Sequence, residues 1–199
     1  NFSTENLCLV GGVNLNSVAT GKISSNLSRW GYKNVFVPPV PYDGGLNIGA
    51  CQYHYHSVLG QPRNKNFHSP YLGEVYAKND VMSSVDERSK ELSVTENISI
   101  KDCAKLLNEG NIVSIFQGKS ESGRRALGNR SILANPKIAN MKQIINDKVK
   151  HRQWYRPFAP SVLEEEAEKW FDNFFPSPYM GFVFKIRKEK LGLAKAIEH

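Results

Sequence analysis

The densest group of side chains able to bind an anion lies between Glu121 and Leu133, in the sequence ESGRRALGNRSIL. Arg125, Arg130 and Ser131 stand here close to glycines. A guanidinium group can bind a phosphate through two parallel hydrogen bonds, and glycines let backbone amides approach the same ligand. Because the arginines alternate with glycine, alanine and leucine, the pattern favours a lined pocket, with a solvated basic face as the alternative.

A second group of cations, Lys150 and Arg152, follows in the sequence KHRQWYRPF. If this stretch is extended, side chains two residues apart point to the same side, where they suit an acyl or phosphoryl anion. Trp154 and Tyr155 could stack on a base, although packing is the more common use of such aromatic side chains. His151 has no evident partner for metal binding.

Two turns in the first half of the chain follow apolar segments. Gly11 and Gly12 come after the run LCLV and before a helical pattern, so their amides could face an anion or simply form a turn. Asp43 follows a second apolar segment and precedes Gly44 and Gly45. A carboxylate at the end of a strand can hold a divalent metal or a ribose hydroxyl, but Asp-Gly is also an ordinary turn sequence.

The apolar periodicity of the first half predicts strands at 7–10 and 35–37 and helices at 14–30 and 46–58. This alternation is typical of an open α/β sheet. Residues 60–95 are rich in Pro, Asn and Ser and have weak periodicity, so we expect a linker there.

The second half shows a similar alternation. Ser99 is expected to cap a helix that ends at Gly110. The further elements predicted are strands at 112–116, 131–134, 158–163 and 181–186, and helices at 138–149 and 164–171.

Positive charge is concentrated in one part of the chain. The 199 residues have a net charge of +7, and residues 117–156 hold ten Lys or Arg but two Asp or Glu. Such a cluster calls for a polyanion or a phosphorylated small molecule. The hydrophobic content of 40% excludes a disordered chain, and no apolar run approaches the roughly 18 residues that a membrane span needs.

The three cysteines, Cys8, Cys51 and Cys103, are odd in number and widely spaced. They form neither a disulfide framework nor a metal-binding knuckle. We therefore expect free thiols and a cytoplasmic protein.

Four segments in order, LCLVGGVNLNSVATGKI, PVPYDGGLNIGACQY, GRRALGNRSILANPK and KHRQWYRPFAPSVL, resemble the successive motifs of the NodU/CmcH family of carbamoyltransferases. The resemblance extends from residue 7 to residue 186. It implies an α/β fold with the end of an actin/hexokinase-like (ASKHA) domain at 1–65, a linker at 66–95 and a YrdC-like twisted α/β sheet domain at 96–199, both domains incomplete.

The resemblance also implies roles for particular residues. Gly11, Gly12, Asn16 and Gly44 would bind a nucleotide, and Asp43 would bind a metal. Lys150, Arg152 and Arg125 would be catalytic. The residues implied for carbamoyl phosphate and ATP are Arg125, Arg130, Ser131, Lys150, Arg152 and Arg156.

The implied reaction makes carbamoyl-adenylate from carbamoyl phosphate and ATP and transfers the carbamoyl group to a hydroxyl of a sugar-like or antibiotic-like acceptor. ATP would be a co-substrate, with Mg²⁺ or another divalent metal, iron among those considered for the first domain. We expect no membrane or nucleic-acid partner and consider a homodimer. Arg124 departs from the family, which usually has proline there. Because expected motifs fall outside 1–199, we expect this segment alone not to complete the reaction.

The alternative hypothesis is a nucleic-acid-binding module that uses the basic segment 117–156. Such a module would present exposed basic residues and bind with steep salt dependence. The carbamoyltransferase hypothesis instead predicts that the cations converge on one concave site. These cations are Arg125, Arg130, Lys150 and Arg152.

Overall fold

The computed structural model describes residues 4–63 and 69–198, and it divides into two compact units built from non-consecutive segments. The first unit joins Asn1–Leu72, Glu121–Leu127 and Asn173–Lys185. The second joins Gly73–Ser120, Gly128–Asp172 and Ile186–His199. The expected domains, 1–65 and 96–199, are each continuous in sequence and are separated by a linker at 66–95; the boundary at residue 65 lies outside the described residues. Those domain boundaries stay a prediction.

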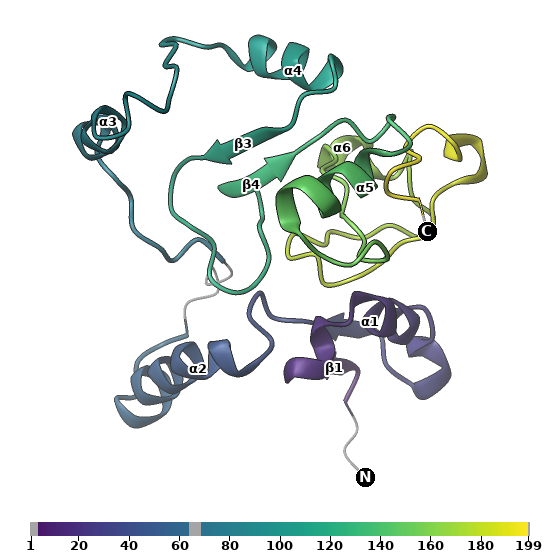
Figure 1. Ribbon diagram of the computed structural model, residues 1–199. Helices are drawn as coiled ribbons and strands as arrows, with labels where there is room; N and C mark the ends of the chain where they lie inside the picture. The colour runs from purple at the N-terminus through teal and green to yellow at the C-terminus, as the bar shows by residue number, and fades with distance from the viewer. Residues whose placement is uncertain (1–3, 64–68, 199) are drawn as a thin grey trace. The chain divides into compact units, whose positions relative to one another are not determined.

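The first unit begins with a parallel pair of short strands, β1 (Asn6–Cys8) and β2 (Asn34–Phe36). Parallel strands require a crossover, which helix α1 (Ser17–Ser24) supplies between two short 3-10 helices, Gly12–Leu15 and Leu27–Trp30 (Figure 1). The strand–helix–strand order is as predicted. The single helix expected at 14–30 is instead divided into three.

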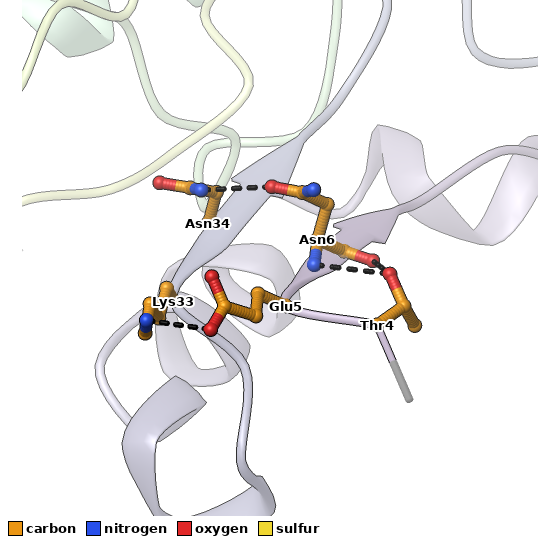
Figure 2. Close-up of polar contacts among 5 residues, drawn as sticks. All are labelled: Thr4, Glu5, Asn6, Lys33 and Asn34. Carbon is orange, nitrogen blue, oxygen red and sulfur yellow. Dashed lines mark hydrogen bonds and ion pairs between the residues drawn. The ribbon is translucent and has the colours of Figure 1, made fainter. Parts of the chain in front are cut away.

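Exposed polar contacts accompany the pairing of β1 with β2 (Figure 2). Nδ2 of Asn34 donates to Oδ1 of Asn6 over 2.8 Å, and Asn6 lies opposite Asn34 in the strand register. Nζ of Lys33 lies 2.6 Å from a carboxylate oxygen of Glu5. Because both charged side chains are solvated, this ion pair contributes about 0 to 1 kcal/mol, so it helps to align the strands more than it stabilises them.

A helix follows the second turn of the first unit, as predicted. The short 3-10 helix Asp43–Gly45 leads into α2 (Leu46–Tyr53), which continues as a π-helical turn, His54–Val58. The strand predicted at 181–186 is not formed. The hydroxyl of the buried Thr20 on α1 donates instead to the carbonyl of Gly181, which attaches this segment to the helix.

The second unit begins with two helices, α3 (Lys78–Asp86) and α4 (Ile100–Asn108) (Figure 1). Helix α3 lies inside the expected linker. Its start is stabilised by the Asp80 carboxylate, which accepts from the amide of Ala77 over 3.0 Å. Helix α4 confirms the prediction at both ends. Ser99 caps it, and Gly110 has a φ of 90° that glycine tolerates.

An antiparallel pair of strands, β3 (Val113–Phe116) and β4 (Arg130–Leu133), follows, close to both predicted ranges. Helix α5 (Met141–Ile145) continues as a π-helical turn, Asn146–Lys150. Helix α6 (Glu164–Ala167) and a 3-10 helix, Lys188–Lys190, complete the unit. No strand forms at 158–163, a described stretch, so that prediction is wrong.

The core of the second unit is small and centres on α5. Met141 and Ile145 are buried against Ala196, and Phe158 and other half-buried side chains pack around them. The protein is thus a mixed α/β structure with two short two-stranded sheets in its described residues. Within the same ranges, no helix has the length and apolar character needed to cross a bilayer.

The cysteines are unpaired, as expected. Cys8 and Cys51 are exposed, and Cys103 is half-buried.

Candidate functional site

The glycine loop of the first unit is held by its own neighbours. Gly11 has a φ of 97°, which requires glycine, and its amide donates to the carbonyl of Pro41 over 2.5 Å. This hydrogen bond occupies the Gly11 amide, which agrees with the turn, one of the two interpretations left open by the sequence; nucleotide binding by the loop stays a prediction. Gly12 opens the short helix after it, and Oδ1 of Asn16 accepts from the amide of Ala19 over 3.1 Å, so Asn16 caps α1.

The second turn places Asp43 in an exposed position beside an aromatic ring. The ring of Tyr42 packs on Gly44, where a Cβ atom would lie 2.8 Å from the ring. The Arg124 guanidinium carbon lies 4.8 Å from the centre of the same ring. This distance is within the range of a cation–π interaction.

The described residues do not assemble a metal site around Asp43. In 4–63 and 69–198, no group of three or more His, Cys, Asp or Glu side chains is placed to hold a metal ion. A lone exposed carboxylate does not match the donor sets of protein-bound divalent metals. Asp43 remains a predicted ligand, and no reaction step is derived through a metal.

Arg125 connects two distant segments of the first unit. Its Nη2 donates to the carbonyl of Leu15 over 2.6 Å, and its Nη1 donates to the carbonyl of Tyr179 over 3.2 Å. Burial lowers the pKa of the Arg125 guanidinium, but arginine stays charged at neutral pH. The side chain thus carries a half-buried positive charge next to the loop that ends at Asn16.

The two ends of the segment Glu121–Leu127 are hydrogen-bonded to each other. Oε1 of Glu121 accepts from the amide of Leu127 over 2.7 Å, and the hydroxyl of Tyr71 donates to the carbonyl of Leu127 over 2.8 Å. Burial raises the pKa of Tyr179, and the charge of Tyr71 raises it further. Neither Glu121 nor the two tyrosines were expected from sequence. The position of Glu121 at the start of the arginine-rich motif was the one available signal.

Arg130 and Ser131 belong to the second unit and shape the turn between β3 and β4. The Arg130 guanidinium carbon lies 3.6 Å from the centre of the Phe116 ring. Its Nη1 donates to the carbonyl of Gln117 over 2.6 Å, and its Nη2 to that of Gly118 over 3.2 Å. The buried Ser131 hydroxyl accepts from the amide of Gly128 over 2.9 Å. Stacking on a ring fixes the plane of the guanidinium.

Lys150 and Arg152 are not on an extended stretch. Lys150 is the exposed last residue of the π-helical turn, and His151 after it has a left-handed φ of 46°. The expected alignment of their side chains through an extended backbone is therefore wrong. The helical turn ends at Lys150, and the Arg152 amide after His151 donates to the carbonyl of Asn146 over 3.0 Å. Arg156 is exposed.

Asn146 organises the region around Arg152 and was not predicted. It is fully buried, and its Nδ2 donates to the carbonyls of Trp154 and Arg156 over 3.4 and 3.2 Å. Nε of Arg152 donates to Oδ1 of Asn146 over 2.7 Å, and the Arg152 guanidinium lies over Phe158 at 4.5 Å. Burial lowers the pKa of Arg152, and the charge of Arg156 lowers it further. No sequence signal distinguishes this asparagine from others in helices.

The structure therefore brings the predicted residues together in two groups. In the first unit Arg125 contacts the loop of Gly11 and Asn16, and Arg124 contacts the turn of Asp43. The second unit holds Arg130, Ser131, Lys150, Arg152 and Arg156. Convergence of Arg125 with the other cations stays a prediction.

Comparison with known proteins gives two family matches. The family described as Carbamoyltransferase N-terminus matches residues 1–52. The family described as Carbamoyltransferase C-terminus matches residues 104–199. Together they cover the segments that contain all the predicted site residues.

Several individual proteins are similar along most of the chain. Nodulation protein NolNO of Sinorhizobium fredii is 38% identical over 98% of the chain, and Nodulation protein NolO of Bradyrhizobium diazoefficiens is 37% identical over 97%. Nodulation protein U of Bradyrhizobium diazoefficiens is 33% identical over 98%. The chain spans 29%, 36% and 32% of the lengths of these three relatives.

Proposed function

This chain belongs to the carbamoyltransferase family, and on that premise we propose that it contributes to both half-reactions of an ATP-dependent O-carbamoyltransferase. Residues 1–65 would be the end of an actin/hexokinase-like domain that performs the transfer. Residues 96–199 would be part of a YrdC-like domain that forms carbamoyl-adenylate. The chain spans about a third of its relatives, so the remaining residues of such an enzyme would supply the acceptor site.

The first half-reaction would form the activated intermediate. Water releases phosphate from carbamoyl phosphate and leaves carbamate. A carbamate oxygen then attacks the α-phosphorus of ATP, and the bond to the β-phosphate breaks, which gives carbamoyl-adenylate and pyrophosphate. Negative charge moves onto the leaving pyrophosphate, so fixed cations lower the barrier without covalent help from the protein. Arg130, Lys150 and Arg152 would supply this charge.

The second half-reaction would transfer the carbamoyl group. An acceptor hydroxyl oxygen attacks the carbamoyl carbon, the bond to the adenylate oxygen breaks, and AMP and a proton are released. We propose a sugar-like or antibiotic-like acceptor. The adenylate would lie at the loop of Gly11, Gly12 and Asn16 and the turn of Asp43 and Gly44.

Arg152 carries the proposal for adenylation. Its Nε and Nη2 donate to Asn146 and Pro157, and its plane lies on Phe158. Within the described part of the chain, its Nη1 has no protein acceptor. A guanidinium held on one side in this way is oriented before the ligand arrives, which is what electrostatic catalysis of phosphate chemistry requires.

The direct test is carbamoyl-phosphate-dependent exchange between ATP and pyrophosphate in the full-length protein. We expect Lys150→Ala and Arg152→Ala each to lower the exchange rate by about 100-fold or more, since each removes a cation from the phosphates. Lys148→Ala removes an exposed charge from the same helical turn and should exchange like the wild type.

The Lys150→Ala result is easier to interpret, because the Lys150 side chain is exposed. Arg152→Ala would also remove a hydrogen bond to Asn146 that stabilises the local turn. Exchange at the wild-type rate in both variants would contradict the proposal. Absence of exchange in the wild-type protein would contradict it as well.

A further inference from the structure

We propose that Arg125 is a positioning residue of the first unit, which holds the loop at residues 11–16 for the nucleotide, and not a member of the adenylation pocket. This inference rests on the proposed function, and it changes the role that the family resemblance implies for Arg125. It also divides the arginine-rich motif Glu121–Leu133 between two tasks. Arg125 serves the transfer half-reaction, and Arg130 serves the formation of the adenylate.

The contacts of Arg125 lie entirely within the first unit. Its two acceptors, the carbonyls of Leu15 and Tyr179, are 110 and 54 residues away along the chain. Leu15 is the last residue of the short helix that Gly12 begins, and Asn16 after it caps α1. The guanidinium therefore fixes the backbone of the loop directly, at the residue where the loop becomes a helix.

The segment around Tyr179 is itself attached to α1, so Arg125 joins two parts of one assembly. Thr20 donates its hydroxyl to the carbonyl of Gly181. At Gly21 the helix approaches Val183 so closely that a Cβ atom would lie 2.9 Å from the Val183 carbonyl oxygen. With Arg125, these contacts connect both ends of the loop-and-helix region to residues 173–185.

The neighbours of Arg125 connect the same segment to the Asp43 turn. The Arg124 guanidinium lies over the Tyr42 ring, and a Cβ atom at Gly123 would contact the Val40 side chain at 3.5 Å. Segment 121–127 thus touches both of the turns that the sequence assigns to a nucleotide. A displacement of this segment would move both turns.

Arginine suits this position better than lysine. Its planar fork presents two Nη groups to two acceptors at once, and here each Nη donates to a carbonyl from a different segment. Lysine has a single ammonium on a flexible stem, and would keep the charge but hold at most part of this geometry. Misplacement of binding groups by about 1 Å can cost roughly 100-fold in rate, so a loosened loop should bind an adenylate poorly.

The test separates the two units in the full-length protein, with AMP alone as the probe. Hydrogen exchange followed by mass spectrometry reports AMP protection of the peptide that covers residues 11–19. We expect AMP to slow amide exchange there in the wild type. In Arg125→Ala the AMP concentration needed should rise about tenfold or more, and Arg125→Lys should recover part of the loss.

ATP–pyrophosphate exchange on the same samples reports the adenylation pocket. It should stay within about threefold of the wild type in Arg125→Ala, whereas Arg130→Ala should lose it. Arg29→Ala, which removes an exposed guanidinium from the first unit, should resemble the wild type in both measurements. Unchanged protection of the β2 peptide in the first unit and of the α5 peptide in the second unit shows that both units are folded in the variants. If Arg125→Ala fails this check, Arg125→Lys decides.

Three results would overturn the inference. Loss of ATP–pyrophosphate exchange in Arg125→Ala as large as that in Lys150→Ala would place Arg125 in the adenylation pocket. Unchanged AMP protection in folded Arg125→Ala would remove its role in the loop. Absence of AMP protection at residues 11–19 in a wild-type protein that exchanges pyrophosphate would refute this inference and leave the adenylation proposal intact.

Discussion

Arg125 and Arg152 use the same chemistry at very different distances along the chain. Both are half-buried, both donate two hydrogen bonds to protein oxygens, and burial lowers the pKa of both. The acceptors of Arg152 are five and six residues away, at Pro157 and Asn146. Those of Arg125 are 54 and 110 residues away. One arginine therefore organises a turn, and the other joins segments that meet only in the folded unit.

This difference determines which segments of the chain each arginine site needs in order to keep its geometry. The Arg152 site consists of residues 146–158, so it forms wherever that stretch folds on α5. The Arg125 site depends on three segments of the chain, and loss of any one of them removes its geometry. We expect substitutions near Arg152 to act locally and substitutions near Arg125 to act on distant peptides.

Asn146→Ala tests the local side of the comparison and should have the largest effect on stability. The substitution removes the acceptor of a charged donor and leaves two carbonyls without their buried partner. The cost should be about 3 kcal/mol in the local opening free energy of residues 145–158. Hydrogen exchange measures it, with the exposed Asn108→Ala as a control of little effect. Loss of protection throughout the first unit would contradict a local role.

Gly21→Ala tests the long-range side of the comparison. The new methyl group would lie 2.9 Å from the Val183 carbonyl oxygen, so α1 or residues 173–185 must move. We expect a cost of about 2 kcal/mol, seen as faster amide exchange in 173–185, more than 150 residues away.

Gly49→Ala is the matched control for that substitution. It also adds a methyl group to a helix, α2, but beyond its chain neighbours and the backbone of α2 no described atom lies within 4 Å of the new position. It should stabilise α2 by about 0.8 kcal/mol through helix propensity. If both variants behave alike, the close approach of Gly21 to Val183 has no energetic role.

Ser99→Ala should have a smaller and more local destabilising effect than Asn146→Ala or Gly21→Ala. It removes the cap of α4, in which the Ser99 hydroxyl accepts from the amide of Asp102 over 3.2 Å, and should cost about 1 kcal/mol in the first turn. The Ser99 hydroxyl and amide also donate to the Asp102 carboxylate, and these hydrogen bonds lower its pKa.

Because this pKa is lowered on folding, the contribution of the ionised Asp102 is present above the pKa of the unfolded chain and is lost as the pH falls through the lowered value. NMR titration should show the Asp102 pKa moving up toward its ordinary value in Ser99→Ala. An unchanged pKa would show that the hydroxyl does not contribute.

The accuracy of the sequence predictions follows the same distinction between near and distant contacts. The helix from Ser99 to Gly110 was predicted at both ends because its cap and its stop are neighbours in sequence. Strands β3 and β4 were also close to prediction. The strands expected at 158–163 and 181–186 are wrong. In the first stretch only Phe158 packs against the core, and residues 159–163 are exposed. The second stretch is attached to α1 by the hydrogen bond from Thr20 to Gly181.

Helix α3 was missed for a different reason. Its polar composition lacks the apolar periodicity that marks a packed helix, yet the Asp80 carboxylate supports its first turn. The function of the arginines could likewise be only partly predicted from the sequence. Their type and clustering indicated anion chemistry, but which oxygen each one contacts was not encoded in their spacing.

The sequence by itself determined the family, the positions of the cations and the helices whose ends are capped by near neighbours, because these depend on residue types within a few positions of each other. Tertiary structure alone decided that Arg125 contacts Leu15 and Tyr179, whereas Arg130 folds onto Phe116 and the turn after β3. A guanidinium donates to whichever carbonyl oxygens the fold brings within about 3 Å. The contact between Arg125 and Leu15, which are 110 residues apart in sequence, therefore exists only in the folded unit.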